Sequence, residues 1–140
     1  MRRISGEMST GRTGERARVL IIDDEPALAS TLGLLLRDET DVTVLTSGEA
    51  ALDLLLRGTE FDAILCDLTM PGLSGMDLYA RLRDARPGIE ARLIFMTGGA
   101  FTPRASAFVA SVANPTVEKP FEVDDVLALV REVTARSRAA

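Results

Sequence analysis

Residues 19–26 read VLIIDDEP, four apolar residues that run directly into two aspartates and a glutamate. An uninterrupted apolar run of this length is typical of a strand buried on both faces of a parallel sheet. Pro26 suits the first turn of a helix, where its missing N–H is not needed. The stretch therefore predicts a strand over residues 18–22, then a helix, with carboxylates at the junction.

The same order of strand and helix recurs to the end of the chain. Further strands are predicted at residues 41–45, 62–66, 91–96 and 116–118, and helices are predicted to start near Pro26, Ser47, Gly75, Ala105 and Val123. The first helix is expected to bury Leu28, Leu32, Leu35 and Leu36. Alternating strands and helices with right-handed crossovers favour an α/β fold. We expect a doubly wound, five-stranded parallel sheet of order 2-1-3-4-5.

Length and composition limit the classes of protein. The chain has 140 residues, the size of one domain, and we expect a flexible tail over residues 1–17 and a folded domain over residues 18–138. The formal net charge is −5 although the tail is rich in arginine, which disfavours nucleic-acid binding. No apolar run approaches the ~20 residues that a membrane span needs. The single cysteine, Cys66, cannot form an intrachain disulfide, so a cytoplasmic location is expected.

Reactive side chains follow four of the predicted strands. Asp23 and Asp24 follow the first strand, Asp67 the third, Thr97 the fourth and Lys119 the fifth. In an open parallel sheet, ligands bind outside the carboxyl ends of the strands, at the point where the strand order reverses. That point lies between the first and third strands. We therefore expect these five side chains to meet there.

Clustered carboxylates indicate a shared cation, because like charges raise one another's pKa. Mg²⁺ takes oxygen ligands, usually one or two carboxylates with waters and phosphate oxygens. A solvated turn is the alternative interpretation of Asp23 and Asp24, and a helix N-cap is the alternative for Asp67. Beside a metal ion, Asp67 could instead attack phosphorus and form an acyl phosphate.

Lys119 is the only lysine among sixteen cationic residues. A chain that otherwise uses arginine has kept a compact point charge at this one position. An ordinary surface lysine is the alternative interpretation. The following Pro120 restricts the backbone of Lys119 and permits a cis peptide bond, which favours a functional role.

Four motifs in this order resemble those of a response-regulator receiver domain, whose fold is flavodoxin-like. They are VLIIDDEP at 19–26, AILCDLTMPGLSGMDL at 63–78, LIFMTGGA at 93–100 and EKPF at 118–121. The resemblance implies that Asp67 accepts a phosphoryl group from a phosphohistidine. It also implies that Asp23, Asp24, Asp67 and the main-chain carbonyl of Thr69 bind Mg²⁺. Thr97 and Lys119 would contact the phosphoryl oxygens.

The resemblance further implies a partner, a histidine kinase or a histidine phosphotransfer domain. The chain has no histidine, so the phosphohistidine must belong to another protein or domain. A weak homodimer is a further option. Segments GGAFTPRA and NPTVEKPF resemble receiver modules of hybrid sensor kinases, which leaves a stand-alone regulator and a hybrid-kinase segment as alternatives. Thr116 stands where receivers commonly have an aromatic residue, three positions before the lysine.

Two other functions remain open at this stage. Phosphatases of the haloacid-dehalogenase type share the aspartate nucleophile, Mg²⁺ and the lysine, but place a second aspartate two residues after the nucleophile. Here that residue is Thr69, so an acyl phosphate should persist, and we expect no enzymatic activity beyond self-phosphorylation. A pseudo-receiver that only binds proteins would usually lack part of the acidic cluster or the lysine, and this chain has both.

Overall fold

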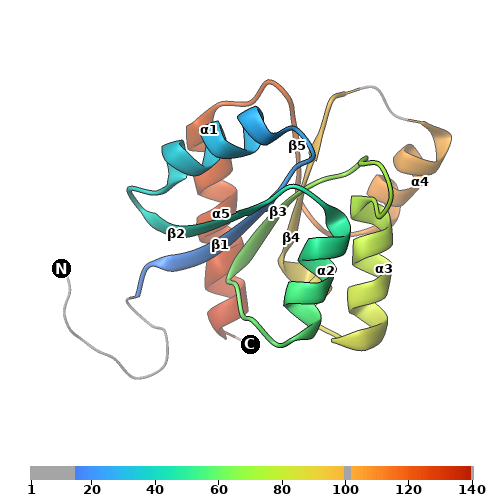
Figure 1. The fold of residues 1–140 in the computed structure, drawn as a ribbon, viewed down its shortest axis with the longest axis horizontal. Coiled ribbons are helices and arrows are strands. Elements are labelled where there is room, and N and C mark those ends of the chain that lie inside the picture. Colours follow the sequence, from blue (N-terminus) through green and yellow to red (C-terminus); the bar gives the residue numbers. More distant parts are fainter. Residues whose placement is uncertain (1–14, 100–101, 140) are drawn as a thin grey trace.

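The computed structural model describes residues 15–99 and 102–139. Its strands form one parallel five-stranded sheet of order β2-β1-β3-β4-β5, with helices on both faces (Figure 1). The elements are β1 (Ala17–Ile22), α1 (Pro26–Leu36), β2 (Thr40–Leu45), α2 (Gly48–Leu56), β3 (Ala63–Asp67), α3 (Gly75–Ala85), the 3-10 helix η1 (Ile89–Arg92), β4 (Leu93–Thr97), α4 (Pro103–Ser111), β5 (Thr116–Glu118) and α5 (Val123–Ala139). The expected α/β fold and strand order are confirmed. Residues 1–14 of the expected tail lie outside the described residues, and Ala17 already belongs to β1.

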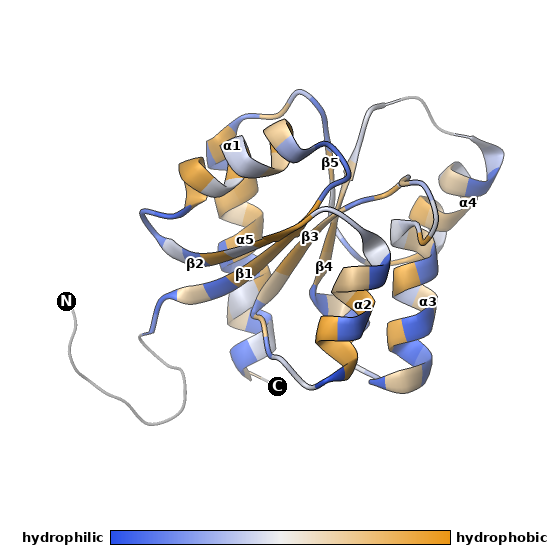
Figure 2. Cartoon of the chain, viewed as in Figure 1, coloured by the Kyte–Doolittle hydropathy of each residue, from blue (hydrophilic) through white to orange (hydrophobic). Residues whose placement is uncertain are grey.

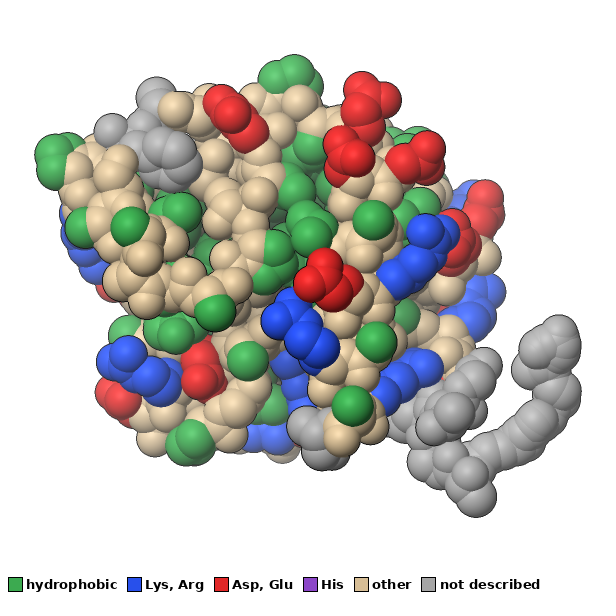
Figure 3. All heavy atoms as spheres, turned by 180° about the vertical axis from the view of Figure 1, so that it is seen from behind, with side chains coloured by type: hydrophobic (Ala, Val, Ile, Leu, Met, Phe, Trp, Pro, Cys, Tyr) green, Lys and Arg blue, Asp and Glu red, His purple; other side chains and the backbone are tan. Residues whose placement is uncertain are grey.

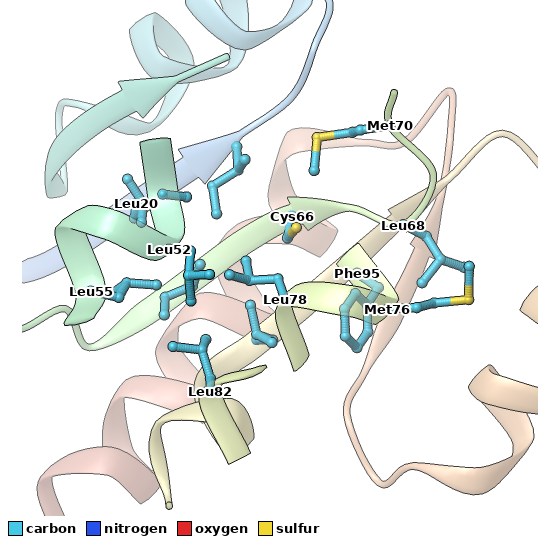
Figure 4. Close-up of a cluster of buried hydrophobic side chains, with 14 of the residues drawn as sticks. Leu20, Leu52, Leu55, Cys66, Leu68, Met70, Met76, Leu78, Leu82 and Phe95 are labelled. Carbon is cyan, nitrogen blue, oxygen red and sulfur yellow. The ribbon is translucent and has the colours of Figure 1, made fainter. Parts of the chain in front are cut away.

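Alternating side chains of the strands build two cores, one on each face of the sheet. On one face, Val19 and Ile21 of β1 pack with α1 and α5. On the other face, Leu20, Cys66 and Phe95 pack with α2 and α3, as Figure 4 shows. The central strands β1, β3 and β4 are accordingly mostly apolar, whereas α2 and α3 also carry hydrophilic residues (Figure 2). Cys66 is a core residue, as its place in the strand predicts.

Helix α1 buries a different stripe from the expected one. Leu32 and Leu36 are buried, but Leu35 is 54% exposed and Leu28 is only partly covered. The buried stripe is completed by small residues, one of them Gly33, where a Cβ would lie 3.2 Å from Cγ2 of Val44. The expectation for Leu35 was wrong because the helix packs closely on β2 through its small residues.

Several strand boundaries differ from the expectation by one or two residues, and two of these differences lie near structured turns or site residues. Residues 91 and 92 belong to η1, so β4 begins at Leu93. The guanidinium of Arg92 donates 2.9 Å to the carbonyl of Phe61 and pairs with Glu60 at 3.0 Å, which fixes this turn. In addition, β3 extends through Asp67, so this residue ends the strand instead of following it.

A buried ion pair joins the start of β1 to the end of α5. Arg138 pairs with Asp62 at 3.2 Å and donates to the carbonyl of Glu15 at 2.9 Å. Asp62 also accepts from the backbone N–H of Arg18 at 2.8 Å, and Ser137 donates to its carbonyl at 2.8 Å. This cluster, Asp62, Ser137 and Arg138 with the backbone of residues 15–18, lies at the amino end of the sheet.

Helix α5 carries its charges in the order that its dipole favours. Asp124 and Asp125 lie in the first turn, and Arg136 and Arg138 in the last. Seen from behind, several acidic side chains lie along the upper edge of the molecule, and others lie lower down among the basic side chains (Figure 3). No helix in the described part of the chain is long and apolar enough to cross a bilayer.

Candidate functional site

Three carboxylates meet at the carboxyl end of the sheet, between β1 and β3. Pairing of Ile22 with Cys66 places Asp23 beside Asp67. Asp23 is fully buried, Asp67 is 6% exposed and Asp24 is exposed. Asp23, Asp24 and Asp67 each offer a carboxylate oxygen, and these oxygens lie within 4.8 Å of one another. Hard oxygen donors at this spacing are a suitable ligand set for Mg²⁺.

Lys119 joins the two buried carboxylates. Its Nζ lies 2.9 Å from Oδ2 of Asp23 and 3.4 Å from Oδ2 of Asp67, and only 18% of its side chain is exposed. The backbone N–H of Lys119 donates to the carbonyl of Thr97 at 2.7 Å, which holds β5 beside β4. The Lys119–Pro120 peptide bond is cis. The structure therefore brings the only lysine to the carboxylates.

The oxygens of the carboxylates are not equally available. Asp23 accepts from the backbone N–H of Glu25 at 2.9 Å through Oδ1 and from Lys119 through Oδ2. The hydrogen bonds that Asp67 accepts within the described part of the chain are longer, both 3.4 Å, from the N–H of Thr69 and from Lys119. Asp24 forms no ion pair within the described ranges. Asp24 and Asp67 therefore have the freer oxygens for an incoming ligand.

Thr97 lies at the end of β4 with its hydroxyl turned inward. The residue is 5% exposed, and Oγ1 has no hydrogen-bond partner among the described residues. A buried hydroxyl without a partner is costly, so it favours a ligand that accepts or donates a hydrogen bond. Gly98, directly after Thr97, has no side chain that could cover it.

Burial and neighbouring charges set the protonation states of the pair. Burial raises the pKa of Asp67, and the charge of Asp23 raises it as well. Lys119 lowers it, but the raising effects outweigh this and bring the pKa of Asp67 to about 6. Burial lowers the pKa of Lys119, but the hydrogen bond to Asp23 and the charges of both aspartates outweigh it and raise that pKa. Lys119 is therefore cationic near neutral pH. Asp67 is an anion there, and a further cation beside it would stabilise its charge.

In the metal-free protein, the contribution of Asp67 to stability should fall as pH rises between about 4 and 6. The pKa of Asp67 is about 6 when folded and about 4 when unfolded, so in this window the folded state holds a proton that the unfolded state has released. Asp67→Asn removes this dependence. We expect the free energy of unfolding of Asp67→Asn, measured with urea in EDTA, to exceed that of the parent increasingly from pH 4 to pH 7. A pH-independent difference would contradict the raised pKa.

Thr116 faces the same side of the sheet as Phe95, its neighbour across β4 and β5. Its Oγ1 is buried and has no partner in the described part of the chain. Aromatic packing near this position comes instead from α3 and α4, because Phe108 contacts both Phe95 and Tyr79 edge to face at 5.3 Å. The side chain of Phe108 therefore covers Phe95 on this face of the sheet.

One contact near the site could not be expected from the sequence. Glu49, at the start of α2, accepts a hydrogen bond at 3.1 Å from the backbone N–H of Leu73, in the loop after Asp67. The two residues are 24 positions apart, and a glutamate in a first helical turn is ordinarily explained by the helix dipole. No sequence signal marks it as part of the site.

Comparisons with known proteins agree with the fold. A family model described as the response regulator receiver domain matches residues 19–131. The chain is 32% identical over 121 residues to the transcriptional regulatory protein DltR of Streptococcus agalactiae serotype III. The matched region covers 86% of this chain and 53% of that protein. It is 35% identical over 117 residues to the DNA-binding response regulator MtrA of Mycolicibacterium smegmatis, with 83% and 50% covered.

A solved structure is similar along nearly its whole length. The response regulator receiver domain protein from Clostridium thermocellum is 25% identical, with a TM-score of 0.77 and coverage of 88% of this chain and 98% of that one. The chain spans about half the length of the curated relatives that it matches. With the acidic cluster at the switch point of the sheet, the family match shows that the chain belongs to the response-regulator receiver domains of two-component signalling.

Proposed function

We propose that Asp67 accepts a phosphoryl group from a phosphohistidine of a histidine kinase or a histidine phosphotransfer domain. Asp23, Asp24, Asp67 and the main-chain carbonyl of Thr69 would hold Mg²⁺. The observation that carries the proposal is the meeting of Asp67 with two further aspartates and Lys119 at one end of the sheet. A carboxylate oxygen of Asp67 forms a bond to phosphorus, the P–N bond breaks, and the imidazole leaves as the neutral base after gaining a proton.

The chain's own residues would position the group and stabilise its charge. Bound Mg²⁺ would supply positive charge to the transferring phosphoryl oxygens. Lys119 already lies 3.4 Å from Asp67 and can turn its ammonium from the carboxylate to a phosphoryl oxygen. The unpartnered hydroxyl of Thr97 can donate to another. Both groups favour the transition state, in which charge spreads over these oxygens.

Thr69 argues against the phosphatase alternative. A hydrolase of that type needs a second carboxyl group two residues after the nucleophile, and Thr69 cannot titrate near neutral pH. We therefore propose that the acyl phosphate of Asp67 persists long enough to act as a signal. A pseudo-receiver is disfavoured because the acidic cluster and Lys119 are all in place.

Helix α1 offers a surface for the phosphohistidine partner. Its eleven residues, PALASTLGLLL, carry no charge, and Leu34 and Leu35 are 57% and 54% exposed. The helix starts directly after the acidic cluster, so a helical partner that covers these leucines would reach Asp67.

Such a partner implies a cytoplasmic location. The DNA-binding relative MtrA is about twice as long as this chain, so its DNA binding does not transfer to the matched half, and a lack of nucleic-acid binding stays a prediction. A weak homodimer also stays a prediction, and so does the choice between a stand-alone regulator and a hybrid-kinase segment.

The test is phosphorylation by a small donor. Incubation with acetyl phosphate and Mg²⁺ should add one phosphoryl group, detected by intact-mass spectrometry, and EDTA should prevent it. ATP with Mg²⁺ should add nothing, because a chain without histidine cannot make its own phosphohistidine. An autophosphorylated cognate kinase should transfer its label within minutes. Label incorporated from ATP alone, or no uptake from any donor, would refute the proposal.

Asp24→Asn should weaken Mg²⁺ binding by about tenfold or more, since a charged ligand becomes neutral. Asp24 is exposed, so the fold should remain, and without metal it should be slightly more stable because repulsion from Asp23 and Asp67 falls. Calorimetric Mg²⁺ titration measures the affinity. Asp84→Asn, an exposed aspartate near the end of α3, is the control and should bind like the parent. Equal affinities in Asp24→Asn and the parent would remove Asp24 from the ligand set.

A further inference from the structure

The N-terminal end of α2 lies against the loop that follows Asp67. In Figure 1 the starts of α2 and α3 are neighbours at the carboxyl end of the sheet. Oε2 of Glu49 accepts the hydrogen bond from the backbone N–H of Leu73, at 3.1 Å. The side chain is exposed, so its position reflects this contact and not burial in the core.

Glycines on both segments let them approach this closely. A Cβ on Gly48 would lie 2.2 Å from the carbonyl oxygen of Leu73, and a Cβ on Gly72 would lie 2.5 Å from Oε2 of Glu49. Gly72 also has a positive φ of 75°, which other residues rarely adopt. The backbone on each side is therefore shaped for contact between Glu49 and the loop.

The two ends of the loop are fixed by the backbone, but its middle is not. Leu68 donates to the carbonyl of Met96 at 2.9 Å, and Gly75 donates to the carbonyl of Leu68 at 3.0 Å. Between these bonds, within residues 15–99 and 102–139, Glu49 supplies the hydrogen bond from α2 to the loop backbone. The other side chains that accept from the loop backbone, Asp67 and Asp77, belong to the elements that flank the loop. Thr69 lies in this middle part and donates to Asp67 at 3.4 Å.

We infer that Glu49 is a positioning residue for the Mg²⁺ site, because it holds the loop that carries Thr69. The inference rests on the proposed role of the Thr69 carbonyl as a metal ligand. Without the bond from Glu49, the loop samples more conformations and must be ordered when Mg²⁺ binds. The loss of one such hydrogen bond should lower the affinity for Mg²⁺ by about three- to tenfold.

Three substitutions separate the hydrogen bond from the charge. Glu49→Ala removes both, Glu49→Gln keeps an acceptor of the same reach without the charge, and Glu49→Asp keeps the charge on a side chain that is one methylene too short. Asp53→Ala is the matched control, because it removes an exposed carboxylate one turn further along α2, which pairs with Arg57 at 2.6 Å. Each protein is titrated with Mg²⁺ by calorimetry and by amide NMR, with the amide signal of Leu73 as the local reporter.

We expect Ala and Asp at position 49 to bind Mg²⁺ about three- to tenfold more weakly, with Gln and the Asp53→Ala control within about twofold of the parent. Phosphorylation by acetyl phosphate should slow in Glu49→Ala at low Mg²⁺ and recover at saturating Mg²⁺, whereas a folding defect would slow it at both. Parent-like binding by Glu49→Ala, or equal loss in Gln and Ala, would overturn the inference. If the parent binds Mg²⁺ but takes up no phosphoryl group, the proposed function is refuted. The Mg²⁺ titrations of the Glu49 variants would still test the inference, because they do not depend on phosphorylation.

Discussion

Replacing Asp67 with asparagine is expected to abolish phosphoryl uptake from acetyl phosphate. The substitution keeps the shape of the side chain but replaces a carboxylate oxygen with an amide, which is a poor nucleophile. Lys119 contacts Asp67 at 3.4 Å but Asp23 at 2.9 Å, so the oxygens of Asp67 are held by weaker hydrogen bonds than those of Asp23. Intact-mass spectrometry of the parent and Asp67→Asn, in Mg²⁺ and in EDTA, measures the effect.

Two controls make this result specific. Hydroxylamine cleaves acyl phosphates, so it should remove the added group from the parent protein. Asp84→Asn, remote from the acidic cluster, should be phosphorylated like the parent. The assignment of Asp67 fails if Asp67→Asn still gains one phosphoryl group, and the neighbouring carboxylates would then need to be tested as acceptors.

The largest loss of stability should come from Arg138→Ala, at the opposite end of the sheet. Only 6% of the Asp62 side chain and 19% of the Arg138 side chain are exposed. Removing one partner of a largely buried ion pair costs about 3–5 kcal/mol. Arg138 also holds the carbonyls of Glu15 and Arg16, so β1 loses the support of α5. Urea denaturation monitored by circular dichroism measures the change.

Arg136→Ala is the matched control for this helix end. Arg136 pairs with Glu132 one turn earlier at 3.8 Å, and both side chains are more than half exposed. Exposed pairs of this kind contribute at most about 0.5 kcal/mol. If Arg138→Ala and Arg136→Ala destabilise the protein equally, the buried cluster around Asp62 is not what joins the two ends of the fold.

The sequence was sufficient for the central strands β1, β3 and β4 because each contains a short apolar run that leads into a polar residue. Parallel pairing then brings those ends together without further information, which is how Asp23, Asp67 and Lys119 could be placed at one site. The strand order is confirmed, and in the structure Lys119 contacts both aspartates. The roles of the individual residues in binding and transfer stay predictions until the substitutions are made.

Features that depend on close packing were not predictable in the same way. Leu35 fits a helical stripe as well as Leu36 does, and only the close approach of Gly33 to β2 decides which side is buried. The turn η1 depends on Arg92 reaching Glu60 and Phe61. The contact of Glu49 with Leu73 likewise joins segments that are distant in the sequence. Periodicity carries no information on such long-range contacts.

The lone lysine makes the site open to covalent labelling. An amine-directed acylating reagent would find one side-chain target in the whole chain, Lys119. Its ammonium lies between Asp23 and Asp67 and its pKa is raised, so little of the reactive free amine exists near neutral pH. Any ligand that moves Lys119 away from these carboxylates should change the rate of labelling. The unaltered protein thus contains one side-chain probe of occupancy, which mass mapping of the peptide that carries Lys119 can follow over time.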